Sequence, residues 1–352
     1  MNVPEHRYSR QRLEPLAPPS DLTATEPELM FKGPKRNELC LKEDGCPLFS
    51  ALPGSKPRVN EVWVKLDCIN LTGVRLDKHS GIFKKKFSGF FATGIIYSLG
   101  DEVSNWRIGE SVIVAAEGMP ALYVSCPCYR LFPIANFQSW AHEEIVTLMT
   151  TIIPAYYALS HIARVAAGET VLIDAEAGAP ALAVYTVGNW LGARPLQYSV
   201  NETRLLVLET KDGESAIDTR QSDIAELVIA ENKTSKVRVW VHAATANYPI
   251  AVDGILACCI HEIVLSHEVR TSQLLPSLVG SSFSHVNALT LAFTSPGLFM
   301  QLLAEAGEFL NTGKKNSTAL QLLTPDEAWK FLSSNSNFDA KRIPILVMKD
   351  KE

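Results

Sequence analysis

The stretch VLIDAEAGAPALAVYTVGNWLGA, residues 171–193, constrains the fold more than any other part of this 352-residue chain. It begins with three apolar residues and Asp174, which predicts a buried strand over 171–174. A turn of small residues follows. Apolar residues then recur at helical spacing over 178–191, and Gly192 is a typical residue at the end of a helix. A strand, a tight turn and a helix in this order begin a nucleotide-binding sheet.

The rest of the chain has two patterns of expected secondary structure. The first consists of short strands and glycine-containing turns, with strands expected over 61–69, 89–100 and 121–124 and a turn followed by a strand over 106–114. The second begins near residue 140 and alternates helices with strands, which favours a parallel sheet with crossover helices. Helices are expected over 142–151, 155–165, 220–231 and 249–259, and further strands over 195–198, 204–209, 237–241 and 262–266.

Both ends of the chain carry local signals. Six prolines among the first 36 residues exclude a regular helix, which predicts a linker or an extended strap. Near the other end, Thr324 and Pro325 precede an apolar-periodic segment, so a helix is expected to begin there with Thr324 as its N-cap. Residues 343–348 predict a closing strand.

Charge and cysteine content exclude several functions. A formal net charge of −5 gives no basic surface for nucleic acid or an acidic membrane. No apolar run looks long enough to span a bilayer, and the N-terminal residues lack the apolar core of a signal peptide. Seven scattered cysteines favour free thiols, and the pair Cys126 and Cys128 lacks partners for a metal site. We therefore expect a cytoplasmic protein without metal, membrane or nucleic-acid partners.

Three segments carry a resemblance to a known family: EVWVKLDCINLTGV (61–74), GFFATGIIYSLGDEVSNWRIGESVIV (89–114) and EEIVTLMTTIIPAYYALSHIARVAAGETVLIDAEAGAPALA (143–183). They resemble the quinone-oxidoreductase branch of the medium-chain dehydrogenases. Within that branch, the sequence is similar to enoyl-reductase domains of fungal-type highly reducing polyketide synthases.

The resemblance implies an α/β fold made of a GroES-like β-rich domain and a Rossmann-like domain with a doubly wound parallel sheet. On this basis we expect a strap over 1–36, the β domain over 37–145, completed by about 295–352, and the Rossmann-like domain over 146–294. The family holds NADPH and transfers hydride to the β-carbon of an enoyl thioester carried by an acyl carrier domain.

The cofactor turn departs from the family pattern. The family has alanine-glycine-glycine-valine-glycine, where this chain has Ala177 and Gly178 followed by Ala179, Pro180 and Ala181. Glycines permit the tight turn and the close approach of backbone to pyrophosphate, and helix amides bind the anion. Proline removes one amide, the alanines add methyl groups, and Glu176 adds a like charge. The turn is therefore predicted not to bind NADPH productively.

The remaining pocket positions follow from the same resemblance. His242 stands near the place where the family often has an asparagine-serine pair close to the nicotinamide, and Arg204 is the one basic residue placed for a 2′-phosphate. The cofactor-binding candidates are thus Gly178, Ala179, Pro180, Ala181, Arg204 and His242. Arg204 is equally explained as a solvated surface charge, and the histidines as satisfied structural residues.

Catalytic candidates are few. Asn70 keeps the family's asparagine after the first long strand, but the family's acidic position is Gly73. Asp77 could donate a proton in principle, or it could be a loop residue beside a lysine run. Tyr157 could face a substrate, although tyrosine pairs on amphipathic helices usually pack in a core.

Three functions follow as hypotheses. The first is an inactive, structural enoyl-reductase-like domain of a polyketide synthase, with reduction absent or supplied by a trans-acting enoyl reductase. The second is an active NADPH-dependent enoyl reductase acting on carrier-bound α,β-unsaturated thioesters. The third, a free-standing quinone-type reductase, is disfavoured by the connector-like start of the chain. Expected partners are neighbouring synthase domains, an acyl carrier domain and a second copy in a homodimer.

Overall fold

The computed structural model describes residues 40–41, 47–48, 56–72, 89–118, 120–137, 139–174, 178–199, 217–218, 237–243, 261–265, 282–312, 320–333 and 342–348. The expected strap over 1–36, the strand over 204–209 and the helices over 220–231 and 249–259 lie outside these residues. Two short strands near the start, β1 (Cys40–Leu41) and β2 (Pro47–Leu48), pair antiparallel.

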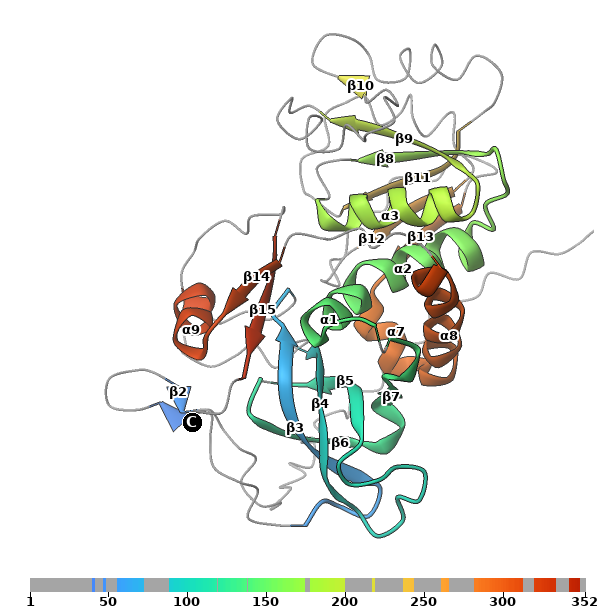
Figure 1. Ribbon diagram of the computed structural model, residues 1–352. Helices are drawn as coiled ribbons and strands as arrows, with labels where there is room; N and C mark the ends of the chain where they lie inside the picture. Colours follow the sequence, from blue (N-terminus) through green and yellow to red (C-terminus); the bar gives the residue numbers. More distant parts are fainter. Residues whose placement is uncertain are drawn as a thin grey trace, which may run out of the picture. The chain divides into compact units, whose positions relative to one another are not determined.

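The larger described sheet is mostly antiparallel and combines strands from both ends of the described chain (Figure 1). Its order is β14-β15-β3-β4-β5-β7, and β6 also pairs with β3. The strands are β3 (Glu61–Asn70), β4 (Gly89–Leu99), β5 (Ser111–Glu117), β6 (Tyr123–Pro127), β7 (Leu131–Pro133), β14 (Leu320–Leu323) and β15 (Ile343–Val347). β14 and β15 are parallel to each other. The four strands expected between residues 61 and 124 and the closing strand expected over 343–348 are confirmed.

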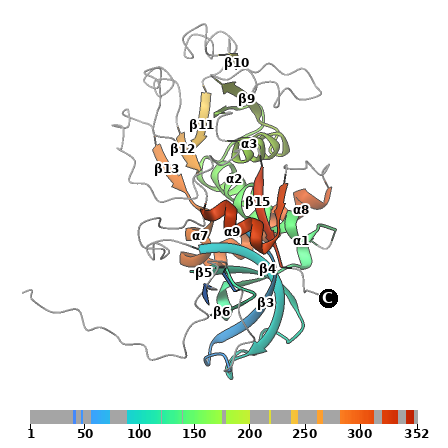
Figure 2. The same cartoon turned by 90° about the vertical axis from the view of Figure 1, so that its left-hand side faces the viewer.

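Long strands of this sheet curve where their pairing register shifts (Figure 2). The register of β3 with β4 shifts between Trp63 and Val64 and again between Leu66 and Cys68, and such bulges bend strands. A Cβ atom at Gly94 would lie 2.3 Å from the carbonyl oxygen of Lys65. Glycine is therefore required where β4 crosses β3 most closely.

The second sheet is parallel throughout its described strands. Its order is β10-β9-β8-β11-β12-β13. The strands are β8 (Thr170–Asp174), β9 (Arg194–Ser199), β10 (Ile217–Asp218), β11 (Val237–Ala243), β12 (His261–Leu265) and β13 (Ser282–Val286). Strand β8 has its sequence successors β9 and β11 on opposite sides, so the winding direction reverses beside it. The doubly wound parallel sheet expected from the sequence is confirmed, and its switch point is the carboxyl end of β8.

The described helices pack against strands of both sheets. They are α1 (His142–Thr150), α2 (Ile152–Tyr156), the π-helix η3 (Tyr157–Ile162), α3 (Ala179–Trp190), α7 (Ala288–Thr294), α8 (Pro296–Thr312) and α9 (Pro325–Ser333), with the 3-10 turns η1 (Cys128–Arg130) and η2 (Ala135–Phe137). The single α-helix expected over 155–165 is wrong in detail, because α2 ends at Tyr156 and a π-helix follows.

Two large apolar clusters form the core. One lies within the mainly antiparallel sheet, with members such as Val64, Ile96 and Val114. The other has Val171, Val184 and Val241 between α3 and the parallel sheet, and it extends to residues of β4 and α8. Alternation along each strand places Ile173, Val239 and Val241 on this helix-covered face.

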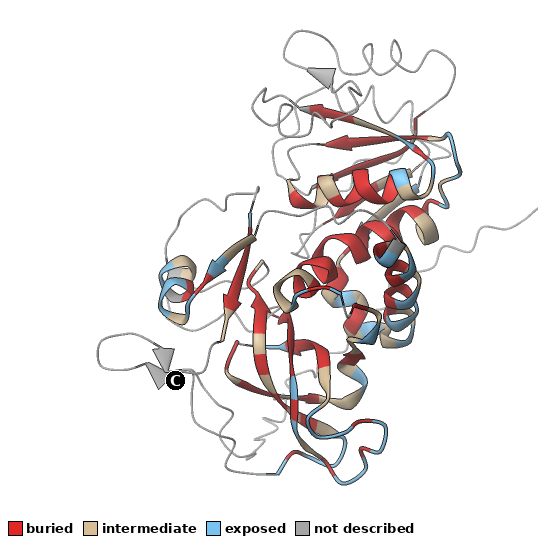
Figure 3. Cartoon of the chain, viewed as in Figure 1, coloured by how far each residue is buried: buried red, intermediate tan, exposed pale blue. Residues whose placement is uncertain are grey.

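Residues 142–162 correct one expectation. Within the described chain, this stretch is a helix long and apolar enough to cross a membrane by length and composition, but 78% of its most apolar window is buried inside the molecule. Figure 3 shows α1 and α2 mostly as buried. Because its apolar surface is already covered by protein, we interpret this stretch as a core helix of the fold.

Candidate functional site

Asn70, at the carboxyl end of β3, is 2% exposed and fully engaged with its neighbours. Its Nδ2 donates to the carbonyl of Val146 at 3.1 Å and to Thr150 Oγ1 at 2.9 Å. Its Oδ1 accepts a hydrogen bond from the backbone amide of Thr72 at 2.8 Å. The side chain thus fastens the end of β3 to α1, and both amide donors already have partners.

The turn into α3 keeps one glycine conformation of a nucleotide-binding turn. Gly178 has φ 67° and ψ −126°, a region that other residues rarely adopt. Its carbonyl accepts from the amide of Leu182 at 3.2 Å, which starts the helix. Gly178 has no capping side chain, and Pro180, in the first turn, has no amide hydrogen.

The two alanines beside Pro180 are packing residues. Ala179 is 7% exposed and belongs to a small apolar cluster with Cys68, Val146, Ile343 and Ile345. We call this cluster the α3 joint. Ala181 is 1% exposed and lies in the core between α3 and the parallel sheet. Both added methyl groups are therefore covered by protein.

The α3 joint brings two predicted site positions close together. The side chain of Val146 packs in the cluster that contains Ala179, while its carbonyl accepts the hydrogen bond from Asn70. Val146 of α1 thus belongs to the cluster at the start of α3 and also binds the residue at the end of β3. This is the arrangement expected of a site shared by the β-rich and Rossmann-like parts.

Cys68 lies in the same joint but is chemically inert. Burial raises the pKa of its thiol to about 12, and the negative charges of Glu143 and Asp67 act in the same direction. The thiol stays protonated at neutral pH, so it lacks the reactivity of a thiolate nucleophile.

His242 lies on the other face of the parallel sheet. Its neighbours in β11, Val239 and Val241, face α3, and Trp240 and His242 alternate to the opposite side. His242 is 4% exposed, and its Nε2 lies 2.9 Å from Glu262 Oε1. The imidazole also stacks on the indole of Trp240, with ring centroids 4.2 Å apart. The side chain is thus held by the sheet and points away from the α3 joint.

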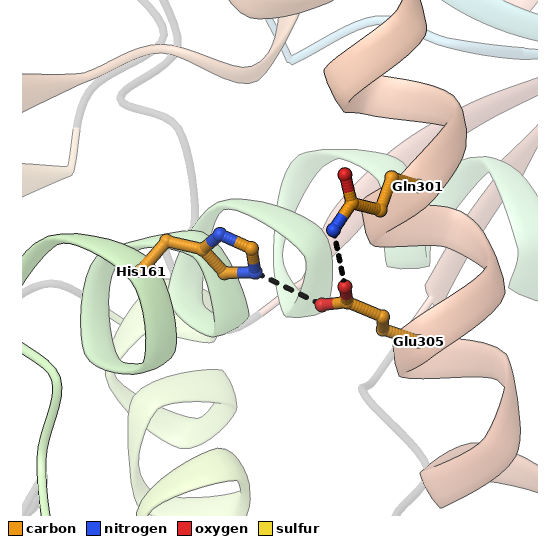
Figure 4. A network of polar contacts seen from close by, with 3 residues as sticks. All are labelled: His161, Gln301 and Glu305. Atoms are coloured by element: carbon orange, nitrogen blue, oxygen red, sulfur yellow. Dashed lines mark hydrogen bonds and ion pairs between the residues drawn. The ribbon is translucent and has the colours of Figure 1, made fainter.

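Tyr157 lies on the π-helix, half-buried against the core, and contacts the ring of His161 at 5.9 Å between centroids. His161 in turn contacts Glu305 of α8, with Nε2 2.9 Å from Oε2 (Figure 4). Sequence reasoning did not single out this pair. The apolar spacing of Phe299, Leu302, Leu303, Ala306 and Leu310 would have predicted α8 as an amphipathic helix.

Five residues of the sequence argument lie outside the described part of the chain: Gly73, Asp77, Glu176, Ala177 and Arg204. Within the described residues, no group of three or more histidine, cysteine, aspartate or glutamate side chains is arranged to hold a metal ion. Cys68, Cys126 and Cys128 are free cysteines.

No family model matches the sequence. Curated relatives are polyketide synthases. Highly-reducing polyketide synthase 1 of Aureobasidium melanogenum is 25% identical over 134 residues, which are 38% of this chain and 6% of that protein. The mycocerosic acid synthase-like polyketide synthase of Mycobacterium tuberculosis is 26% identical over 165 residues, 47% of this chain and 8% of that protein. The hybrid PKS-NRPS synthetase pynA of Aspergillus niger is 22% identical over 264 residues, 72% of this chain and 7% of that protein.

These relatives are far longer than this chain, which matches only a small part of each. Among solved structures, the CurF ER cyclopropanase from the curacin A biosynthetic pathway aligns with a TM-score of 0.68 and 17% identity, covering 85% of this chain and 94% of that one. The CurK enoyl reductase gives a TM-score of 0.66 at 19% identity, with coverage of 85% and 94%. Escherichia coli quinone oxidoreductase complexed with NADPH gives 0.66 at 15% identity, with coverage of 85% and 95%.

The structural likeness confirms the GroES-like and Rossmann-like fold expected from the sequence, a fold that binds NADPH in the E. coli quinone oxidoreductase. The resemblance to polyketide synthases is confirmed by the curated relatives. This chain is similar in sequence to a part of polyketide synthases, and its fold is that of the solved enoyl reductases and quinone oxidoreductase.

Proposed function

We propose that this chain is an enoyl-reductase-like domain of a polyketide synthase that performs no reduction and serves as a structural part of the synthase. One observation carries the proposal: the first turn of α3 is used for packing. Ala179 and Ala181 are 7% and 1% exposed, and both contact core residues. Pro180 between them has no amide to offer an anion.

The chemistry of this turn fits a dinucleotide poorly. A pyrophosphate needs several backbone amides and a close approach of the helix start, which glycines allow. Glu176 stands two residues before Gly178 in the sequence, and a carboxylate near two phosphates costs about 1–4 kcal/mol at partly buried distances. This corresponds to roughly one to three decades in affinity.

The engagement of Asn70 and His242 supports the same conclusion. Asn70 uses both amide hydrogens on α1, and His242 is paired with Glu262 on the face away from α3. A substrate or a nicotinamide would have to displace these buried contacts. Breaking a hydrogen bond in a buried site without replacing it costs about 1–3 kcal/mol.

A retained fold does not require a retained reaction. The structural neighbour described as a cyclopropanase has the enoyl-reductase fold, so the same scaffold accommodates different chemistry. In a large synthase such a domain can set the spacing of neighbouring domains. On this proposal, the partners are those domains and an acyl carrier domain, reduction is absent or supplied in trans by a separate enoyl reductase, and the domain lies in the cytoplasm, with a second copy as a further partner.

We also propose the domain division expected from the sequence, with boundaries near residues 36, 145 and 294. The membership of β14 and β15 in the same sheet as β3 supports assigning the last part of the chain to the β-rich domain.

Titration with NADPH, followed by nicotinamide fluorescence, tests the proposal. No saturable binding is expected up to millimolar NADPH. The matched control carries Glu176→Ala, Ala179→Gly, Pro180→Val and Ala181→Gly, and its affinity is expected to rise by at least tenfold. Saturable micromolar binding by the unaltered chain would contradict the proposal.

A second function is favoured by the conformation of Gly178 and the position of Asn70. The positive φ of Gly178 and an asparagine at the end of β3 are the features expected of an active NADPH-dependent enoyl reductase. Such an enzyme would oxidise NADPH in the presence of a crotonyl or tiglyl pantetheine thioester. If the unaltered chain oxidises NADPH in this assay and an Asn70→Ala variant does not, this alternative is established and the purely structural role is excluded.

A further inference from the structure

The helical stretch before β8 contains one residue more per turn than an α-helix. Over Tyr157–Ile162 the chain is π-helical, and the amide of Ala163 donates to the carbonyl of Ala158 at 2.9 Å, five residues back. The amide of Val165 then donates to Leu159 at 2.9 Å, and Arg164 adopts a left-handed φ of 50°. π-Helical turns are rare and costly, so a tertiary contact must favour this register.

The π register places Tyr156 and His161 on one side of the helix. In an α-helix of 3.6 residues per turn, two residues five apart point about 140° away from each other. A turn closed by hydrogen bonds between residues five apart returns them to the same side. The two rings contact each other at 6.0 Å between centroids, and the ring of Tyr157 lies 5.9 Å from that of His161.

Glu305 of α8 contacts the imidazole that this register presents. Oε2 of Glu305 lies 2.9 Å from His161 Nε2, and Oε1 accepts a hydrogen bond from Gln301 Nε2 at 2.7 Å (Figure 4). The Gln301 contact, one turn away on the same helix, orients the carboxylate. In an α register, His161 would be rotated by about 100° and would lose this partner.

We propose that Glu305 holds the stretch from Tyr156 to Val165 in its π register, so that this stretch is a two-register element and Glu305 is its latch. Losing the contact with His161 would allow an α-helical turn, with Ala163 bonded to Leu159, and would shift the extra residue into the turn that precedes β8.

The position of this element gives the register a consequence for the site. It follows α1, which holds Asn70 through Val146 and Thr150, and it leads into β8, which feeds the turn before α3. A change of register would move the Tyr157 ring relative to α1 and alter the entry of β8. The inference does not depend on whether NADPH binds, because Glu305, His161 and the hydrogen bonds of the π turn lie outside the α3 joint.

The test is a structure of the Glu305→Ala variant together with amide hydrogen exchange. The expected structure has Ala163 bonded to Leu159 and an α-helical turn over 157–162. Protection of the Val165 amide is expected to fall by at least tenfold, because its present acceptor, Leu159, is taken by Ala163. Glu308→Ala removes the same charge from the same helix and is expected to keep the π-helix and its protection.

Deletion of Ser160 provides a second measurement if the first variant folds poorly. The deletion removes the extra residue and enforces the α register. With Glu305 present, the deletion should clearly lower the denaturation midpoint. In the Glu305→Ala variant, the same deletion should lower the midpoint by less than half as much. Equal effects in both backgrounds, or an unchanged π-helix in the Glu305→Ala structure, would overturn the proposal.

Discussion

Helices α3 and α9 begin in opposite ways. At α9, Thr324 Oγ1 accepts from the amide of Glu327 at 3.4 Å, while the Glu327 carboxylate accepts from the Thr324 amide at 2.8 Å. This confirms Thr324 as the N-cap, and the reciprocal pair is a capping box. Helix α3 begins at Gly178 with no side-chain cap. A helix without a side-chain cap has free first-turn backbone amides that could bind a ligand. At α3, however, the first turn carries the buried methyl groups of Ala179 and Ala181.

The comparison separates two properties that a nucleotide-binding turn normally combines. The backbone of Gly178 still has the conformation such a turn requires, whereas Ala179 and Ala181 have become part of the core. The conformation of Gly178 therefore does not by itself indicate a bound ligand, because the same backbone shape serves the strand-to-helix connection.

The largest expected effect comes from removing both methyl groups. Ala179→Gly combined with Ala181→Gly should lower the free energy of unfolding by about 2–4 kcal/mol, from roughly 0.8 kcal/mol per lost methyl and up to about 1 kcal/mol per helical glycine. Urea denaturation measures it, with Ala304→Gly on the exposed side of α8 as the control for glycine propensity. A double variant no less stable than that control would mean that the turn is not a packing element.

Removing the Asn70 side chain should have the next largest effect. Asn70→Ala removes three hydrogen bonds, to the Val146 carbonyl, the Thr150 hydroxyl and the Thr72 amide, which costs about 2–3 kcal/mol although the hydroxyl keeps its bond to the Thr147 carbonyl. Thermal unfolding measures the loss, and Asn60→Ala, at an exposed position just before β3, is the control. If both variants melt alike, Asn70 does not fasten β3 to α1.

Changing the caps sharpens the contrast between the two helix starts. Thr324→Ala removes a working N-cap and should destabilise the protein by about 1 kcal/mol. Gly178→Ser adds a capping side chain to α3 but should also destabilise, by about 1–2 kcal/mol, because φ is positive there. Paired urea titrations measure both, and a stabilising Gly178→Ser would show that the turn relaxes to an ordinary cap.

The smallest expected effect concerns a third helix start, that of α1. A hydrogen bond to Asp67, 3.3 Å away, raises the pKa of His142, and burial opposes the shift. The folded pKa is above the unfolded value, so this pair stabilises the protein below about pH 6.5 and the contribution is lost as pH rises through the folded pKa. Both groups are about one-third exposed, so the contribution is below about 1 kcal/mol.

The contribution of the His142–Asp67 pair is measured by comparing the free energy of unfolding of the unaltered chain and of the His142→Gln variant across a range of pH. The variant should be less stable than the unaltered chain at pH 5.5 and equally stable at pH 9. If the difference in stability between the two proteins grows as pH rises, the assigned direction of the His142 pKa shift is wrong.

Strong local patterns made much of the fold predictable. Alternation over 61–69, the apolar run at 171–174 and the Thr324 cap each depend on neighbours in sequence, and all appear where expected. The short strands β7 and β14 and the edge strand β13 were not predicted, because three to five residues carry little periodic signal.

The site was less predictable, because its contacts join distant parts of the chain. Asn70 was chosen for its place in a family pattern, but its bond to Thr150 spans 80 positions. The π-helix depends on Glu305, 144 positions from His161, which no local propensity can encode. The substitutions at Ala179 and Ala181 were visible in the sequence, whereas their burial emerged only from the packing of α3.

The covered methyl of Ala179 also bears on how such a chain can change over generations. A single reversion to glycine sacrifices contacts at once, while Pro180 still withholds a donor, so no binding compensates. If the turn does not bind NADPH, as we propose, this single reversion therefore gives a less stable protein with no gain in binding, and natural proteins have little stability to spare. A buried methyl at this position thus opposes its own replacement by glycine.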